Sequence, residues 1–262
     1  MIGGKSLVHN DESVINYRSK NWYLIPFPET KGAPYVADNL ATASNSSFRA
    51  DPEFQLAISA SESRWVSSGM KRDISWRLHV GLFSARLALD SAREGSHFVE
   101  LGAGRGFMAA GILSALGNEA LAAKRVIFHL MDTFRSDWQG ENSRKALTSK
   151  PQYYADGPEE VVEYFSSFSQ VKIVEGQLPH TLKSLPADGK VAFLHVDLNS
   201  AQSESACLQE LAPRLGSRSV ILFDDSTNPG CDEQLKVHRQ FARDMGSTLL
   251  ELPTGQALLV LS

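Results

Sequence analysis

The chain has 262 residues, 42% of them hydrophobic, with a net charge of -4 and a pI of about 6.0. This balance excludes a broad nucleic-acid-coating surface, and without an apolar run of about 18 residues we expect no membrane span. The N-terminus lacks the basic start and apolar core of a signal peptide, and Cys207 and Cys231 have no metal or redox spacing. We therefore expect a cytoplasmic protein with reduced thiols.

The N-terminal quarter differs from the rest of the chain. Aromatic residues and prolines are mixed with the polar stretch 41–47, which is typical of a loop-rich arm. One helix is expected to begin near Asp51, with Pro52 in its first turn, and another near Asp73. We assign residues 1–72 to an N-terminal arm with lid helices and residues 73–262 to the main domain.

From residue 97 onward, short apolar runs alternate with helical patterns. Strands are predicted at 98–101, 126–131, 171–174, 191–196, 219–223, 248–252 and 258–261. Alternation of this kind predicts an α/β fold, a Rossmann-like doubly wound sheet that is mainly parallel. The link 253–256 permits an antiparallel hairpin of the last two strands but is too short for a helical crossover.

A glycine loop follows the first of these strands. Gly102, Gly104 and Gly106 let the backbone turn sharply, and the helix that follows presents free N–H groups to a ligand. A dinucleotide fold would place its third glycine at position 107, where this chain has Phe107. The preceding acid, Glu100, instead makes the loop similar to the E-x-G-x-G-x-G motif of class I S-adenosylmethionine-dependent methyltransferases.

Residues after the next two strands are candidates for the rest of a nucleoside. Asp132 ends the second strand, where one carboxylate can accept hydrogen bonds from two ribose hydroxyls. Gly176 and Gln177 follow the third strand, where glycine allows close approach and the amide can bind a base edge. We predict a ribose contact at Asp132 and an adenine contact at the Gly176–Gln177 pair.

Three aspartates end two later strands. Asp197 follows the strand 191–196, and Asp224 and Asp225 follow the strand 219–223. The carboxyl ends of neighbouring parallel strands meet at the ligand-binding edge of an open sheet, so these carboxylates can converge. Such a donor set suits Mg²⁺, which could bind two vicinal hydroxyls while an adjacent carboxylate acts as general base. His195 faces the same side as Asp197, and we interpret it as a core histidine.

Several segments together resemble the macrocin-type sugar O-methyltransferases, a family of metal-dependent class I enzymes. The resemblance runs from Trp76 to Leu261 and is carried by residues 99–102, 131–134, 176–182, 194–197 and 222–225. It implies that Thr133 and Phe134 join Asp132 at the cofactor, that Asp197, Asp224 and Asp225 hold Mg²⁺, and that Asp197 is also the base. Asn199 stands where the family has a second acid, and Ser226 where it has a tyrosine.

The sequence thus predicts an S-adenosyl-L-methionine- and Mg²⁺-dependent O-methyltransferase. Its acceptor would be a sugar hydroxyl of a glycosylated natural product or glycan, with no nucleic acid or membrane partner, and a homo-oligomer could share the N-terminal arm between subunits. A catechol-type O-methyltransferase, an NAD-dependent oxidoreductase and a non-catalytic scaffold that binds S-adenosylmethionine are the alternatives. The missing third glycine argues against the oxidoreductase, and the three aspartates argue against the scaffold.

Overall fold

The sheet at the centre of the fold has seven strands in the order β5-β4-β3-β6-β7-β9-β8. The computed structural model describes residues 35–38, 40–42, 44–65, 73–135 and 157–262, so most of the predicted N-terminal arm lies outside the described residues. The strands are β3 (His97–Leu101), β4 (Ile127–Asp132), β5 (Val171–Glu175), β6 (Val191–Val196), β7 (Val220–Phe223), β8 (Leu250–Glu251) and β9 (Ala257–Val260).

The pairing confirms the predicted fold class. Strands β3, β4, β5, β6 and β7 pair in parallel, whereas β9 pairs antiparallel with both β7 and β8. Strand β8 is shorter than the predicted 248–252, and both of its residues are exposed at the sheet edge. No described helix is long and apolar enough to cross a bilayer.

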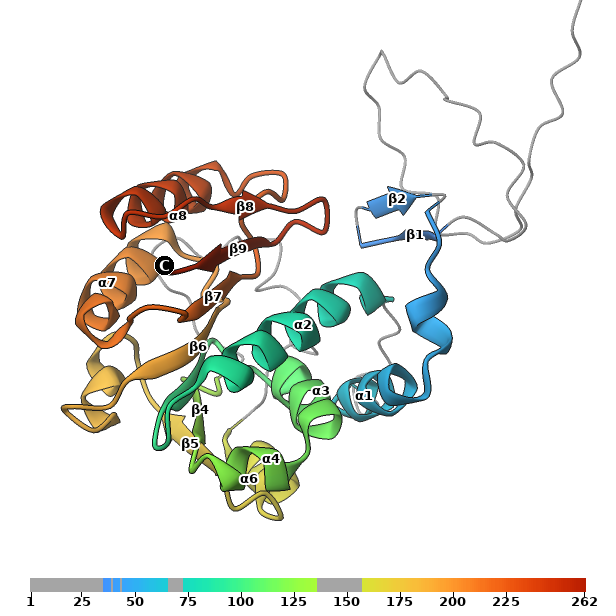
Figure 1. Cartoon of the computed structure of the whole chain (residues 1–262), viewed down its shortest axis with the longest axis horizontal. Helices are drawn as coiled ribbons and strands as arrows, with labels where there is room; N and C mark the ends of the chain where they lie inside the picture. The colour runs from blue at the N-terminus through green and yellow to red at the C-terminus, as the bar shows by residue number, and fades with distance from the viewer. Residues whose placement is uncertain (1–34, 39, 43, 66–72, 136–156) are drawn as a thin grey trace, which may run out of the picture. The chain divides into compact units, whose positions relative to one another are not determined.

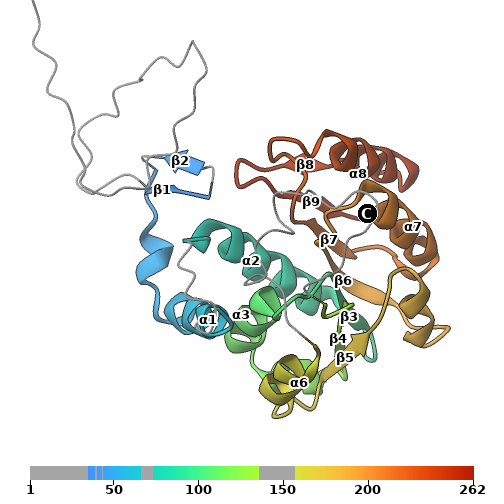
Figure 2. The ribbon, with the colours of Figure 1, turned by 180° about the vertical axis from the view of Figure 1, so that it is seen from behind.

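Helices cover both faces of the sheet (Figures 1 and 2). One face packs against α2 (Ser75–Ser91), α3 (Phe107–Leu116), α4 (Asn118–Ala123) and α6 (Glu159–Phe165), and α1 (Pro52–Ser63) packs on α3. The other face packs against α7 (Ala201–Leu211) and α8 (Asp232–Asp244). The 3-10 turns are Ser47–Ala50, His180–Ser184 and Ala212–Arg214. Each face therefore has its own apolar core, as expected for a doubly wound sheet.

Local sequence explains where the helices begin and end. The side chain of Asp51 caps α1 by accepting hydrogen bonds from the backbone N–H groups of Glu53 and Phe54, as predicted. The helix expected to run from residue 107 to about 121 is instead divided into α3 and α4. The division falls at Gly117, whose φ of 78° a helix cannot accommodate.

The N-terminal residues that the structure describes pack closely on this sheet domain. A short hairpin, β1 (Tyr35–Ala37) and β2 (Leu40–Thr42), precedes α1. Helix α1 approaches α3 so closely that a Cβ on Gly111 would lie 2.4 Å from Ser61 Oγ. The predicted lid function of residues 1–72 stays a prediction.

The pairing of β3 with β6 contains a register shift. His97 pairs with Val191, but Phe98 pairs with Phe193, so one residue of β6 is skipped. This irregularity aligns Glu100 with His195 across the two strands. Residues paired in parallel strands point to the same face, so the two side chains meet inside the sheet domain.

Candidate active site

The glycine loop and Asp197 lie at the point where the strand order reverses. Strands β3 and β6 are neighbours in the sheet, and the chain leads from β3 to β4 on one side and from β6 to β7 on the other. Open α/β sheets bind ligands at such a point. Gly102 has a φ of 85°, and a Cβ there would lie only 1.9 Å from the carbonyl oxygen of Asp197. Gly102 therefore allows the glycine loop to touch the loop that carries Asp197.

Asp132 links the glycine loop to the end of β4 by hydrogen bonds of its carboxylate. Its Oδ2 accepts a hydrogen bond from the Gly104 N–H at 2.8 Å. Its Oδ1 accepts from the Phe134 N–H at 2.8 Å and from the Thr133 hydroxyl at 3.3 Å. A carboxylate offers about four acceptor positions, so these three hydrogen bonds leave Asp132 about one position for a ribose hydroxyl. The ribose contact stays a prediction.

The other predicted cofactor residues occupy different environments. Gly106 has a φ of 81°, and a Cβ there would lie 2.4 Å from the ring of Phe165, so packing alone requires a glycine. Gly176 follows β5, and its N–H donates to the carbonyl of Asp132 at 2.8 Å. Gln177 is exposed, whereas Phe134 as a whole residue is 1% exposed and belongs to the core. The contact of Phe134 with a cofactor stays a prediction.

The three aspartates that the sequence predicts to converge do lie together. Asp197, Asp224 and Asp225 each offer a carboxylate oxygen within 4.8 Å of the others. Backbone hydrogen bonds hold two of them in register: the Asp197 N–H donates to the Leu101 carbonyl at 2.8 Å, and the Asp224 N–H to the Val196 carbonyl at 2.9 Å. Burial, and then the charges of Asp224 and Asp225, raise the pKa of Asp197 well above its usual range.

Arg77 of α2 places a cation inside this cluster, which the sequence analysis missed. Its Nη1 donates to Asp224 Oδ2 at 2.6 Å and lies 3.5 Å from Asp225 Oδ1, and its Nε donates to Asp38 Oδ2 at 2.8 Å. Burial opposes its charge, but Asp224, Asp38 and Asp225 outweigh burial and raise the pKa of Arg77 further. For Asp224, burial is likewise outweighed by Arg77 and His195, so its pKa falls below its usual value.

Glu100 and His195 form a buried pair beneath the glycine loop. His195 Nδ1 lies 3.0 Å from Glu100 Oε1, and its Nε2 lies 3.8 Å from Asp224 Oδ1. Burial opposes protonation of His195, but the carboxylates of Asp224 and Glu100 raise the pKa of His195 to about 10. His195 is thus buried in the core, as interpreted, and the neighbouring carboxylates favour its protonated form.

A second buried network supports the loop after β7, and no ligand spacing in the sequence indicates it. The hydroxyl of Ser226 lies 2.8 Å from His238 Nδ1, and His238 Nε2 lies 2.7 Å from Glu204 Oε2. A serine, histidine and glutamate in this order resemble a hydrolytic triad, but Ser226 is 1% exposed. Its N–H and that of Thr227 both donate to the Gly255 carbonyl, which leaves neither for an oxyanion. The network therefore anchors the loop that follows Asp225.

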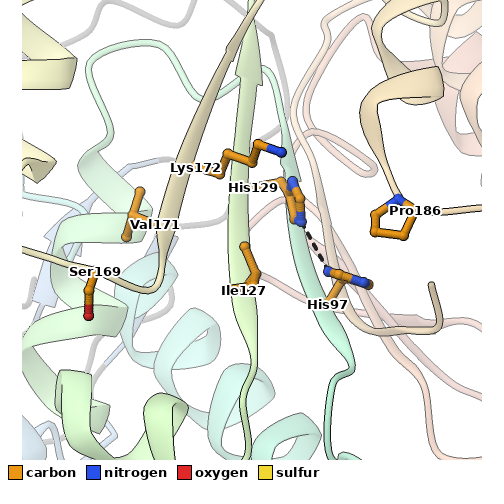
Figure 3. A pocket seen from close by; sticks show the side chains of 7 residues that line it. All are labelled: His97, Ile127, His129, Ser169, Val171, Lys172 and Pro186. Atoms are coloured by element: carbon orange, nitrogen blue, oxygen red, sulfur yellow. Dashed lines mark hydrogen bonds between the residues drawn. The ribbon is translucent and has the colours of Figure 1, made fainter.

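One pocket lies at the amino-terminal ends of β3, β4 and β5, opposite the ends that carry the aspartates (Figure 3). It is lined by His97, Ile127, His129, Ser169, Val171, Lys172 and Pro186. His129 Nε2 lies 3.0 Å from His97 Nδ1, and burial, followed by His97 and Lys172, lowers the pKa of His129 to about 3. None of the predicted site residues lines this pocket, so it is separate from the acidic cluster.

Comparisons with known proteins agree with this arrangement. Residues 99–226 match a family model described as a methyltransferase domain. Among solved structures, the O-methyltransferase NovP is 21% identical with a TM-score of 0.58, over 71% of this chain and 79% of that chain. The calicheamicin methyltransferase CalS11 is 18% identical with a TM-score of 0.56, over 84% of this chain and 98% of that chain. A comparison with curated proteins finds no match.

These likenesses concern the fold, because the sequence identities are low. The strand order, the antiparallel β9, the glycine loop at the reversal point and the matched segment all agree with one another. The chain therefore contains a methyltransferase domain over residues 99–226, built on the fold of the class I S-adenosylmethionine-dependent methyltransferases.

Proposed function

We propose that the chain is a Mg²⁺-dependent O-methyltransferase that acts on a sugar hydroxyl of a glycosylated natural product or glycan. The observation that carries the proposal is the cluster of Asp197, Asp224 and Asp225, in contact with the glycine loop through Gly102. A methyl donor on that loop and an acceptor on the aspartates would then meet at the same edge of the sheet.

The donor set fits a hard divalent cation. Three carboxylates with oxygens within 4.8 Å of one another provide oxygen ligands only, which Mg²⁺ prefers, and leave further positions for water or substrate. When bound there, Mg²⁺ would supply Lewis-acid activation of an acceptor hydroxyl. Asp197, Asp224 and Asp225 are the residues that would hold it.

Asp197 has the position and environment of a general base. It lies between the glycine loop and the Asp224–Asp225 pair. Its pKa is raised, and a general base works best when its pKa is close to the pH of the reaction. In the proposed reaction, the proton of the acceptor hydroxyl passes to Asp197, and the acceptor oxygen forms a bond to the sulfonium methyl carbon as the bond from that carbon to sulfur breaks. The protein's remaining task is alignment of the two substrates.

The cofactor would lie along the carboxyl ends of β3, β4 and β5. Gly102, Gly104 and Gly106 would shape the site of the methionine end. Asp132, with Thr133 and Phe134 beside it, would bind the ribose, and Gly176 with Gln177 would contact the adenine. Glu100 is 2% exposed and paired with His195, so it would support the loop from below.

A sugar acceptor is favoured by the description of one similar protein. A second structure of CalS11 is described as a TDP-rhamnose 3'-O-methyltransferase of calicheamicin biosynthesis, at 17% identity and a TM-score of 0.52 over 80% of this chain and 95% of that chain. That description concerns the relative, and the acceptor of this chain is part of the proposal.

Calorimetry followed by an activity screen tests the proposal. We expect S-adenosylhomocysteine to bind and NAD to give no signal, and we expect methylation of a glycosylated acceptor that EDTA abolishes and Mg²⁺ restores. Asp197→Ala should abolish turnover while S-adenosylhomocysteine still binds, and the exposed Asp244→Ala serves as control. Full activity of Asp197→Ala would refute the assignment of base and metal ligand, whereas methylation only of catechols would reassign the acceptor.

A further inference from the structure

The acidic cluster contains a permanent cation that comes from outside the matched domain. Arg77 is 5% exposed, and its guanidinium donates to the Asp224 side chain, to the Asp224 carbonyl at 3.0 Å and to the Thr254 carbonyl at 3.3 Å. An arginine side chain is not deprotonated in proteins, so this charge is present whether or not a metal ion is bound.

The charges explain why a cation is needed there. Four carboxylates, those of Asp38, Asp197, Asp224 and Asp225, surround or adjoin the guanidinium at the carboxyl edge of the sheet. A buried charge whose partner is removed strongly destabilises the folded state. Without a metal ion, Arg77 therefore supplies a counter-charge on which the folded site depends.

Arg77 also fixes the direction of one aspartate. Asp224 Oδ2 accepts from Arg77 Nη1 at 2.6 Å, and Asp224 Oδ1 accepts from Gln256 Nε2 at 3.2 Å. Ligating carboxylates are commonly oriented by such outer hydrogen bonds. On the other side, Asp38 at the turn between β1 and β2 holds the Arg77 Nε at 2.8 Å.

We propose that Arg77 is a positioning residue that holds the acidic cluster folded in the absence of metal and shares Asp224 with the divalent cation when it binds. This role rests on the metal site proposed above. Since Arg77 and Asp38 both precede the matched segment 99–226, the N-terminal part of the chain completes the metal site of the domain.

Thermal unfolding in EDTA and in saturating Mn²⁺, without cofactor or acceptor, tests this role. The variants are Arg77→Met, which removes the charge, and Arg77→Lys, which keeps the charge but not the planar fork. The control is Arg86→Met on the same helix, whose side chain is 52% exposed and pairs with Glu53. In EDTA we expect Arg77→Met to melt roughly 10 °C below wild type, and Arg86→Met within about 2 °C of it.

The effect of Mn²⁺ on the melting temperature should then distinguish a counter-charge role of Arg77 from a role in ordinary packing. We expect it to restore at least half of the loss in Arg77→Met, a larger shift than in wild type, with Arg77→Lys in between. If Arg77→Met does not fold, Arg77→Lys alone should still show the lower melting temperature and the larger Mn²⁺ shift. Equal Mn²⁺ shifts in Arg77→Met and wild type, or a melting temperature of Arg77→Met in EDTA that matches Arg86→Met, would overturn the proposal.

A failure of the metal site itself gives a different pattern. In that case Mn²⁺ shifts neither wild type nor any variant, and the double variant Arg77→Met with Asp224→Asn decides the role of Arg77. A melting temperature of the double variant above that of Arg77→Met would support charge compensation by Arg77. No such recovery would overturn the role of Arg77 as well.

Discussion

The contact between the glycine loop and the Asp197 loop makes Gly102→Ala the most informative single substitution. The new methyl group would lie 1.9 Å from the Asp197 carbonyl oxygen and 2.7 Å from its carbon, both backbone atoms that cannot rotate away. The φ of 85° adds a second cost, because residues with a Cβ disfavour this region. Either the glycine loop or the end of β6 has to move.

The two costs can be separated by a matched control. Gly230 has a φ of 84°, and a Cβ there would meet nothing within 4 Å, so Gly230→Ala carries the backbone cost alone. That cost is about 1–2 kcal/mol. Forcing a methyl group into packed atoms adds about 1–3 kcal/mol. We therefore expect Gly102→Ala to lower the free energy of unfolding by about 2–5 kcal/mol, and Gly230→Ala by about 1–2 kcal/mol.

Urea unfolding followed by circular dichroism measures both values, and turnover measures the consequence for the site. A displacement of about 1 Å in a catalytic group can reduce turnover on the order of a hundredfold, so Gly102→Ala should lose activity that Gly230→Ala keeps. Equal unfolding free energies for the two variants would show that the Asp197 carbonyl is not in contact with the loop, and the reasoning would be wrong.

Two further predictions concern single carboxylate and imidazole groups. Asp132→Ala should weaken S-adenosylhomocysteine binding by about 1.5–3 kcal/mol, since it removes a charged acceptor and frees the Gly104 N–H; calorimetry that shows unchanged affinity would place the ribose elsewhere. For His195, the pKa raised to about 10 means that the folded state keeps a proton that the unfolded chain loses above its ordinary value of 6.5. The stabilisation is therefore complete below that ordinary value and is lost as the pH rises through the folded pKa. Urea unfolding in EDTA at several pH values should show this decline in wild type and a weaker one in His195→Gln, and parallel curves would contradict it.

Much of the fold follows from short-range patterns. The run 191–196 is apolar except for His195, and the structure buries all of its residues in a central strand. The convergence of Asp197 with Asp224 was predictable for a related reason, since both follow buried strands whose carboxyl ends must meet at one edge. The end of a strand can be recognised from the local sequence, because an apolar run stops there.

Contacts across long sequence separations were not predictable in the same way. Arg77 and Asp224 are 147 residues apart, and no local pattern specifies that α2 brings the guanidinium to this edge. A weaker signal did exist, because Arg77 directly precedes Leu78, which belongs to the apolar face of a predicted helix. The sequence shows a cation beside an apolar helix face and carboxylates at the ends of strands. That the cation pairs with the carboxylates can be inferred only once the topology is known.

The network of Ser226, His238 and Glu204 was missed for a similar reason. Its members come from the loop after β7, from α8 and from α7, and their spacing matches no ligand or catalytic motif. Side-chain hydrogen bonds between helices depend on how the helices pack, which hydrophobic periodicity does not determine.

The register shift between β3 and β6 has a consequence for the comparison of this chain with its relatives. Strand β6 has six residues and β3 has five, and the skipped residue decides that His195, not Leu194, stands opposite Glu100. A deletion of Ala192, the skipped residue, would make the pairing regular from His97 and Val191 onward and would leave His195 opposite Glu100. An alignment with a relative whose β6 lacks this extra residue therefore needs a gap at Ala192. Without that gap, Leu194 would be compared with the residue that stands opposite the glutamate.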